Sequence, residues 1–153
     1  MTLDATLSAD FYDLLREFHR VGVRFLVVGA HALSAHGVTR ATGDLDVWVE
    51  ASPENAILVH RALEAFGAPL SAHAITAADF EKQGTVYQMG LPPLRIDVLT
   101  QISGVQFSEA WATRTIVKVR DLELPVLGKA TLIANKRAAG RPKDLLDVEL
   151  LEK

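Results

Sequence analysis

Two short apolar segments that carry acids constrain the fold of this chain more than any other feature. Residues 44–49 (DLDVWV) alternate acidic and apolar side chains, and residues 94–99 (LRIDVL) place Asp97 inside an apolar run. Residues two apart on a strand point to the same side, so Asp44 and Asp46 project from one face. An acid within an apolar strand is costly unless it is solvated, paired with a cation or bound to metal. We therefore expect a sheet whose acids gather on one accessible face.

Helix and strand signals surround these two segments. Ser8 predicts the start of a helix that ends near Gly22, and Ser52 with Pro53 predicts a helix through residue 66. Residues 29–37 predict a tight turn and a short helix, and one helical turn is expected after Thr76. Further strands are expected at 23–28, 85–89 and 116–119, and further helices at 107–113, 130–139 and 142–151. The segments 85–89 and 94–99 are expected to pair as a hairpin.

These elements predict an α+β fold: a short, twisted, mixed sheet with the three acids on one face and helices on the other face and at the C-terminus. A hydrophobic content of 49% in 153 residues is enough for one continuous core. We expect a single domain over residues 1–153, with a core at about 23–120 and C-terminal helices at about 130–152.

Composition excludes several classes of function. The net charge of −3 gives no general attraction for nucleic acid, so any polyanion must meet a local basic patch. The absence of cysteine excludes disulfides, thiolate zinc sites and cysteine nucleophiles. His31 and His36 lack the spacing of a helical zinc motif. The acidic N-terminus is unlike a signal peptide, and no apolar run approaches the roughly 18 residues of a membrane span, so a cytoplasmic protein is expected.

The acids themselves favour a metal site. Asp44 and Asp46 repel each other when ionised, and a hard divalent cation such as Mg²⁺ or Mn²⁺ offsets that repulsion through oxygen ligands. With Asp97 on a neighbouring strand, three acids can hold two ions about 3.5–4 Å apart. One ion would bind a triphosphate and the other would lower the pKa of an attacking hydroxyl, which is the chemistry of nucleotidyl transfer.

Three motifs together resemble the nucleotidyltransferase superfamily, which includes polymerase beta and the aminoglycoside nucleotidyltransferases. They are residues 27–30 (VVGA), 40–46 (RATGDLD) and 95–99 (RIDVL), in that order along the chain. A C-terminal segment, 135–147 (NKRAAGRPKDLLD), resembles a small bacterial branch related to the nucleotidyltransferases of abortive-infection and toxin–antitoxin systems. The resemblance runs from about Phe25 to Glu152.

The resemblance implies a role for particular residues. Asp44, Asp46 and Asp97 would be the catalytic and metal-binding acids, and the helix that begins at the 29–30 turn would face the triphosphate. The nucleotide-binding residues that it implies are Gly29, Ala30, Arg40, Thr42, Lys136, Arg137 and Lys143. Many members have serine or glycine where this chain has Ala30, so the hydroxyl at that turn is missing.

The implied reaction is in-line attack of an acceptor hydroxyl on the α-phosphate of a nucleoside triphosphate, with release of pyrophosphate. The sequence leaves open whether ATP or another triphosphate is the donor. The acceptor could be RNA, a protein or a small molecule, and a cognate protein partner or a second copy of the chain could complete the cleft.

Each motif also has a structural interpretation. The 29–30 turn could be only a turn, Asp44 and Asp46 a solvated strand start, and Asp97 a surface partner of Arg95. The basic residues between 129 and 143 could be a solvated helix face. A second function is therefore kept, in which the domain binds nucleotide or acts as an antitoxin-like protein-interaction module without catalysis.

Overall fold

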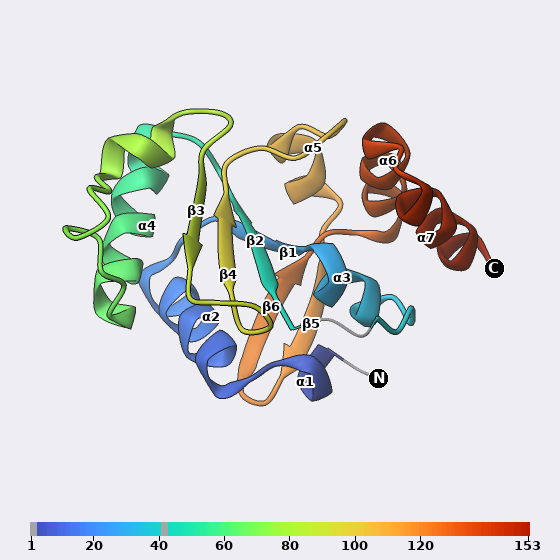
Figure 1. Ribbon diagram of the computed structural model, residues 1–153, viewed down its shortest axis with the longest axis horizontal. Coiled ribbons are helices and arrows are strands. Elements are labelled where there is room, and N and C mark those ends of the chain that lie inside the picture. Colours follow the sequence, from blue (N-terminus) through green and yellow to red (C-terminus); the bar gives the residue numbers. More distant parts are fainter. Residues whose placement is uncertain (1–2, 41–42) are drawn as a thin grey trace.

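The protein is built around a six-stranded mixed sheet (Figure 1). The computed structural model describes residues 3–40 and 43–153. The strands are β1 (Phe25–Val28), β2 (Leu45–Val49), β3 (Val86–Met89), β4 (Ile96–Leu99), β5 (Thr115–Val119) and β6 (Leu122–Val126). They lie in the order β3-β4-β2-β1-β6-β5. The pairs β2–β4 and β1–β6 are parallel, whereas β1–β2, β3–β4 and β5–β6 are antiparallel. The expected α+β fold with a mixed sheet is confirmed.

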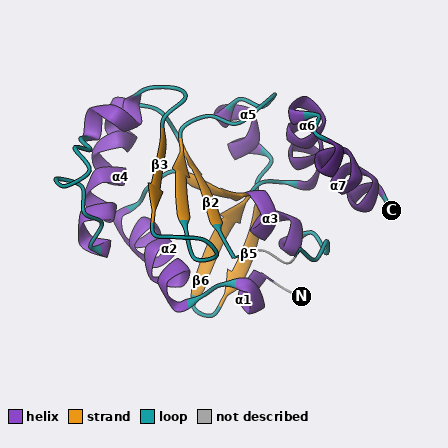
Figure 2. Cartoon of the chain, viewed as in Figure 1, coloured by secondary structure: helices purple, strands orange, loops and turns teal. Residues whose placement is uncertain are grey.

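Helices flank the sheet on both sides (Figure 2). They are α1 (Leu3–Thr6), α2 (Ala9–Val21), α3 (Gly29–Ala35), α4 (Pro53–Phe66), the 3-10 helix η1 (Ala77–Glu81), α5 (Phe107–Ala112), α6 (Lys129–Ala139) and α7 (Pro142–Glu152). The last two pack against each other at one end of the molecule (Figure 1). Within the described ranges, no helix combines the length and the apolar character that crossing a bilayer requires.

The helix ends form as the local sequence predicts. The Ser8 hydroxyl accepts a hydrogen bond from the Phe11 N–H at 3.2 Å, and Gly22 ends α2 in the left-handed conformation. In α4, the Ser52 hydroxyl accepts from the Asn55 N–H at 3.2 Å, with Pro53 in the first turn. These caps fix where α2 and α4 begin and where α2 ends.

The sheet has one fully covered face. Alternate residues of the central strands, such as Val47 and Val98, are buried there. Two aromatic pairs, edge to face, show what covers it: Phe18 of α2 lies 5.4 Å from Phe25, and Phe80 of η1 lies 6.4 Å from Tyr87. The acids project from the opposite face of the sheet, where Trp48 packs against Phe107 of α5.

Two elements were not expected from the sequence. The strand β6 lies inside the sheet between β1 and β5, although Pro125 is one of its residues. Proline cannot donate to a ladder and normally argues against an interior strand, which is why the pattern there is misleading. The other element, α1, is a single turn of 4 residues, too short for a periodic signal.

Candidate active site

The register of the sheet brings the acids together. Asp46 and Asp97 are direct partners on the parallel strands β2 and β4, so their side chains point to the same face. Asp44 lies two residues before Asp46, at the start of the same segment. On the other side of β2, Val28 is the partner of Asp46, which places the end of β1 beside the acids. The three acids that the sequence singles out therefore lie together on one face of the sheet, where β1, β2 and β4 are neighbours.

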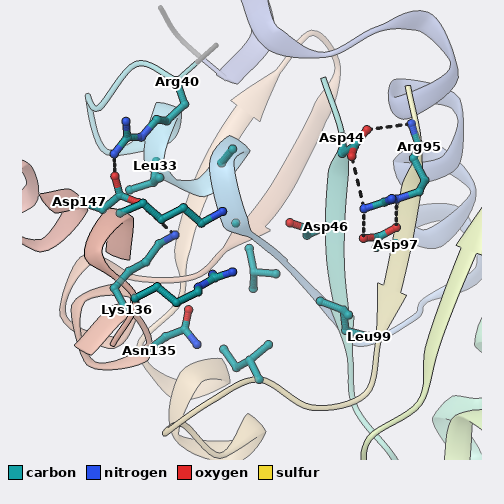
Figure 3. A pocket seen from close by; sticks show the side chains of 16 residues that line it. Leu33, Arg40, Asp44, Asp46, Arg95, Asp97, Leu99, Asn135, Lys136 and Asp147 are labelled. Atoms are coloured by element: carbon teal, nitrogen blue, oxygen red, sulfur yellow. Dashed lines mark hydrogen bonds and ion pairs between the residues drawn. The ribbon is translucent and has the colours of Figure 1, made fainter. Parts of the chain in front are cut away.

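Arg95 connects two of these acids. Its guanidinium donates to Asp97 from Nε at 2.9 Å and from Nη2 at 3.3 Å, and the same Nη2 lies 3.4 Å from Asp44 (Figure 3). The Arg95 backbone N–H also donates to Asp44 at 3.1 Å. The ion pair that the sequence offered as an alternative for Asp97 is therefore present. It belongs to the acid cluster rather than to an isolated surface pair.

Asp46 is the acid that Arg95 neutralises least. Burial, followed by the neighbouring charge and hydrogen bond of Asp97 and a smaller contribution from the charge of Asp44, raises the pKa of Asp46 to about 7. The more distant charge of Arg95 lowers this pKa only in part. A proton or a cation at Asp46 is therefore favoured near neutral pH.

The turn into α3 lies directly against Asp46. Gly29 has a φ of +66°, in the left-handed region that favours glycine, and it leads the chain from β1 into α3 at once. Gly29 and Ala30 both line the cavity in front of the acids. The 29–30 turn is thus part of the site.

The opposite wall of the cavity is a charged network on α6 and α7. Lys136 Nζ lies 3.5 Å from Asp144. It also lies 3.2 Å from Asp147, which pairs with Arg40 from the loop after α3 (Figure 3). Arg141 donates to Asp144 from Nε at 2.6 Å. Both carboxylates are buried, so part of the positive charge of the basic residues around them is neutralised by ion pairs that hold the two helices together.

The pKa values of this network follow its burial. Burial lowers the pKa of Lys136, against the opposing charge and hydrogen bond of Asp144. Burial alone would raise the pKa of Asp144, but the hydrogen bond and charge of Arg141, with the charge of Lys136, bring it below its ordinary value. The side chain of Lys143 is exposed, lines the cavity and forms no ion pair with any residue that the structure describes.

A cavity of about 590 Å³ separates the acids from the basic wall. Its apolar lining residues are Val28, Leu33, Leu99 and Ile102, and its polar ones are Arg40, Asp44, Asp46, Arg95, Asp97, Asn135, Lys136, Arg141, Lys143 and Asp147, with Gly29 and Ala30 at one end. This volume lies in the range of ordinary small-molecule sites. Residues that lie far apart in the sequence, from Val28 to Asp147, thus meet around one space.

One of the expected nucleotide-binding residues that the structure describes does not line this cavity. Arg137 is not among its lining residues, because its guanidinium points to the surface and lies 2.8 Å from Glu152. Thr42 lies outside the described residues. The histidines are structural: His31 is buried with its Nδ1 2.8 Å from the Thr6 hydroxyl, and His36 Nε2 lies 2.8 Å from the Leu127 carbonyl oxygen.

The acids suit a divalent cation in type and in charge. Asp46 and Asp97 offer adjacent hard oxygen ligands, and the pKa of Asp46 is raised first by burial and then by the charge of Asp97. As the side chains stand, however, no group of three or more acidic or histidine side chains among residues 3–40 and 43–153 is arranged to hold a metal ion. The third acid, Asp44, is bonded to Arg95 instead.

Sequence reasoning did not identify several residues of the site. Asn135 lines the cavity and donates to the Ser103 carbonyl oxygen at 2.9 Å, which ties α6 to the loop after β4. Arg141 and Asp147 belong to a segment singled out in the sequence, but only the structure shows that they face the acids. The apolar floor of Leu99 and Ile102 carries no sequence signal that separates it from ordinary core.

Comparison with solved structures identifies the fold. The lincosamide antibiotic adenylyltransferase LnuA, solved with lincomycin bound, superposes over 96% of this chain and 97% of its own, with a TM-score of 0.56 and 12% identity. The chain has the nucleotidyltransferase fold. A Thermotoga maritima protein assigned to the nucleotidyltransferases matches over 92% of this chain and 87% of its own, with a TM-score of 0.54 and 13% identity. No protein-family model matches the sequence, and neither does any curated protein.

Proposed function

We propose that this protein is a metal-dependent nucleotidyltransferase, which moves a nucleoside monophosphate from a nucleoside triphosphate to an acceptor hydroxyl and releases pyrophosphate. One observation carries the proposal: the paired acids Asp46 and Asp97 face a basic wall across a single cavity, with the 29–30 turn beside the acids. Electrostatic stabilisation and positioning are the main requirements of transfer at phosphorus, and the two walls supply both.

The basic wall would receive the triphosphate, and its members are not equivalent. Lys136 and Arg40 are held by buried carboxylates, so they are pre-organised but partly neutralised. Lys143 has no carboxylate partner among the described residues and would bind phosphate oxygens directly. The backbone N–H groups of the 29–30 turn would approach the same phosphates from the other side.

The cavity as a whole contains almost no excess positive charge. The basic residues around it are matched by a similar number of buried or lining carboxylates. A triphosphate adds several negative charges, so its binding requires cations from solution. This balance supports two divalent ions, Mg²⁺ or Mn²⁺, bound together with the nucleotide.

The acids would hold these ions on the sheet face. Asp46 and Asp97 are already adjacent, and Asp44 would join them once its bonds to Arg95 are released. When bound, the ions supply charge neutralisation at the phosphates and activation of the attacking hydroxyl. Asp97 is the acid nearest the open edge of the sheet, so we assign it the additional role of assisting deprotonation of the acceptor.

We also propose a narrower placement of the protein. The segment that ends in Asp144 and Asp147 supports the branch related to abortive-infection and toxin–antitoxin nucleotidyltransferases, because these two carboxylates organise the basic wall. LnuA, whose fold is similar, is an adenylyltransferase for lincosamide antibiotics. That activity makes ATP the first donor to test here. We also propose that the protein acts in the cytoplasm.

Binding of radiolabelled ATP, GTP, CTP and UTP, each with Mg²⁺ or Mn²⁺, tests the proposal. The wild type is compared with the double variant Asp44→Asn/Asp46→Asn, which keeps the shape of both side chains. We expect binding that requires the metal and is lost in the double variant. The nucleotide that binds most tightly identifies the base of the natural donor. Equal binding by both proteins, or binding that does not depend on the metal, would mean that Asp44 and Asp46 have no part in the function.

A second function is favoured by one observation. Arg95 neutralises Asp44 and Asp97 internally, and the acids do not enclose an ion as they stand. A domain that binds nucleotide or a partner protein without catalysis would have this arrangement. Nucleotide binding with no transferred product in any acceptor mixture would support this alternative.

A further inference from the structure

Two aliphatic side chains give the cavity an accessible apolar surface. Leu99 lies two residues after Asp97 on β4, so both side chains point to the same face of the sheet. Ile102 lies in the loop after that strand, and both aliphatic residues line the cavity. They are half-buried, whereas Val28 and Leu33 of the same lining are fully buried. A ligand in the cavity therefore meets apolar surface beside the acids.

A single amide, Asn135 of α6, belongs to the same end of the cavity. Like Leu99, it lies away from Arg40 (Figure 3). Among the lining residues that the structure describes, it is the one polar side chain without a charge. Its Nδ2 donates to the Ser103 carbonyl oxygen at 2.9 Å, which fixes the side of the amide that carries nitrogen. Its Oδ1 accepts no hydrogen bond from the described part of the chain and can accept one from a ligand.

The loop after β4 holds this amide in one direction. Besides the bond to Ser103, a second contact joins this loop to α6: Gly104 packs so closely that a Cβ there would collide with the Ala138 side chain. Gly104 also has a φ of +73°, in the region that favours glycine. Because both contacts exist before a ligand binds, the Asn135 oxygen is pre-oriented, and recognition through it costs less entropy.

From this arrangement we propose that Leu99, Ile102 and Asn135 bind the base of the nucleoside triphosphate and select adenine or cytosine. These two bases carry an exocyclic amino group where guanine and uracil carry a carbonyl oxygen. The flat face of the base packs on the two aliphatic side chains, and the amino group donates to Asn135 Oδ1. The inference rests on the proposed function, because that function supplies the nucleotide. We call the three residues the base subsite.

Other occupants fit the base subsite less well. Phosphate groups would lie against two aliphatic side chains and an amide oxygen that repels their charge. Guanine or uracil would place a carbonyl oxygen opposite Asn135 Oδ1, so the amide would have to turn over. That would break the bond to Ser103 and bring Oδ1 against the Ser103 carbonyl oxygen, leaving two acceptors without a donor. An amino-bearing base keeps the hydrogen bond that the structure shows.

The test compares the affinity for ATP with that for inosine triphosphate, which carries a carbonyl oxygen in place of the amino group. CTP and UTP form a second pair of the same kind, and inorganic triphosphate, which has no base, reports on the phosphate end alone. All are titrated with Mg²⁺ into the wild type and Asn135→Leu, which keeps the size of the side chain without its hydrogen bonds. The control is Gln101→Leu, which removes an exposed amide of the same loop that does not line the cavity.

We expect the wild type to bind ATP about tenfold more tightly than inosine triphosphate, and CTP about tenfold more tightly than UTP. Asn135→Leu should bind the two members of each pair equally, and Gln101→Leu should keep the preference. Inorganic triphosphate should bind equally to all three proteins, which shows that each is folded. Asn135→Ala replaces Asn135→Leu if the latter does not fold.

Three results would overturn the inference: equal affinity of the wild type for both members of each pair, a preference for the carbonyl-bearing base, or a preference that survives the loss of Asn135. In each of these cases, metal-dependent binding that is lost in Asp44→Asn/Asp46→Asn would leave the proposed function standing. If the wild type binds no triphosphate in the presence of the metal, both the inference and the proposed function are refuted.

Discussion

Gly29 and Asp46 approach each other so closely that a Cβ on Gly29 would collide with Asp46 Oδ2. Gly29 also needs a left-handed φ of +66°. Substitution Gly29→Ala should therefore cost about 1–2 kcal/mol from the backbone conformation alone. It should also displace the carboxylate, so that metal-dependent nucleotide binding is lost. Chemical denaturation and nucleotide titration measure the two effects.

Gly37 is the matched control for this substitution. It has a φ of +87°, but a Cβ there would meet nothing within 4 Å. Gly37→Ala should show a similar loss of stability and keep nucleotide binding. If the two variants bind nucleotide equally well, contact between residues 29 and 46 has no role in the site.

Asp46 should make the metal-free protein less stable as pH rises. Its pKa is about 7 in the folded protein and near 3.8 when unfolded. Below the unfolded pKa both states are protonated, and no penalty exists. As pH rises towards 7, the unfolded state loses the proton while the folded state retains it, so the free energy of unfolding falls.

Asp46→Asn removes this penalty. In the presence of a chelator the variant should exceed the wild type in stability by about 1–2 kcal/mol at pH 8, and the difference should shrink towards pH 4. Thermal and urea unfolding across this range provide the measurement. A difference that does not depend on pH would contradict the environment assigned to Asp46.

Lys136 and Lys143 should separate stability from binding. Removal of the buried charge in Lys136→Met leaves Asp144 and Asp147 without their shared cation and should cost about 3 kcal/mol or more. Lys143→Met should leave the free energy of unfolding within about 0.5 kcal/mol of the wild type. It should still weaken triphosphate binding about tenfold, since its charge is available to the ligand. A stable Lys136→Met protein would refute the structural role of the network.

Arg95 should compete with metal for the acids. Arg95→Gln removes the cation that lies between Asp44 and Asp97 and should tighten Mn²⁺ binding in the absence of nucleotide by about threefold to tenfold. Arg95→Lys keeps the charge and should stay near the wild type. Paramagnetic or calorimetric titration measures the affinity. Weaker Mn²⁺ binding by Arg95→Gln would mean that the arginine chiefly orders the acids.

Most of the fold could be predicted from local signals. The caps at Ser8 and Ser52 and the glycines after each helix report directly on backbone conformation, so α2 and α4 were correctly placed. Strand β6 was missed because Pro125 is tolerated there by its particular place in the ladder, opposite Ile116. That tolerance is a tertiary effect and has no local pattern.

In the candidate site too, some features follow from local sequence signals and others depend on tertiary packing. The spacing of Asp44, Asp46 and Asp97 predicted that they share a face, since strand alternation is a local rule. The partners of Lys136 and the outward direction of Arg137 depend on how α6 packs on α7. Two residues next to each other in sequence therefore have different surroundings, which charge patterning could not distinguish.

Transfer of the α-phosphate tests the central claim most directly. The protein, Mg²⁺ and a cell extract are incubated with triphosphate labelled at either the α or the γ position, using the wild type and Asp97→Asn. The account predicts that only the α label reaches an acceptor, that the γ label is released as pyrophosphate, and that Asp97→Asn abolishes both while it remains folded. Transfer of the γ label, or full transfer by Asp97→Asn, would contradict it.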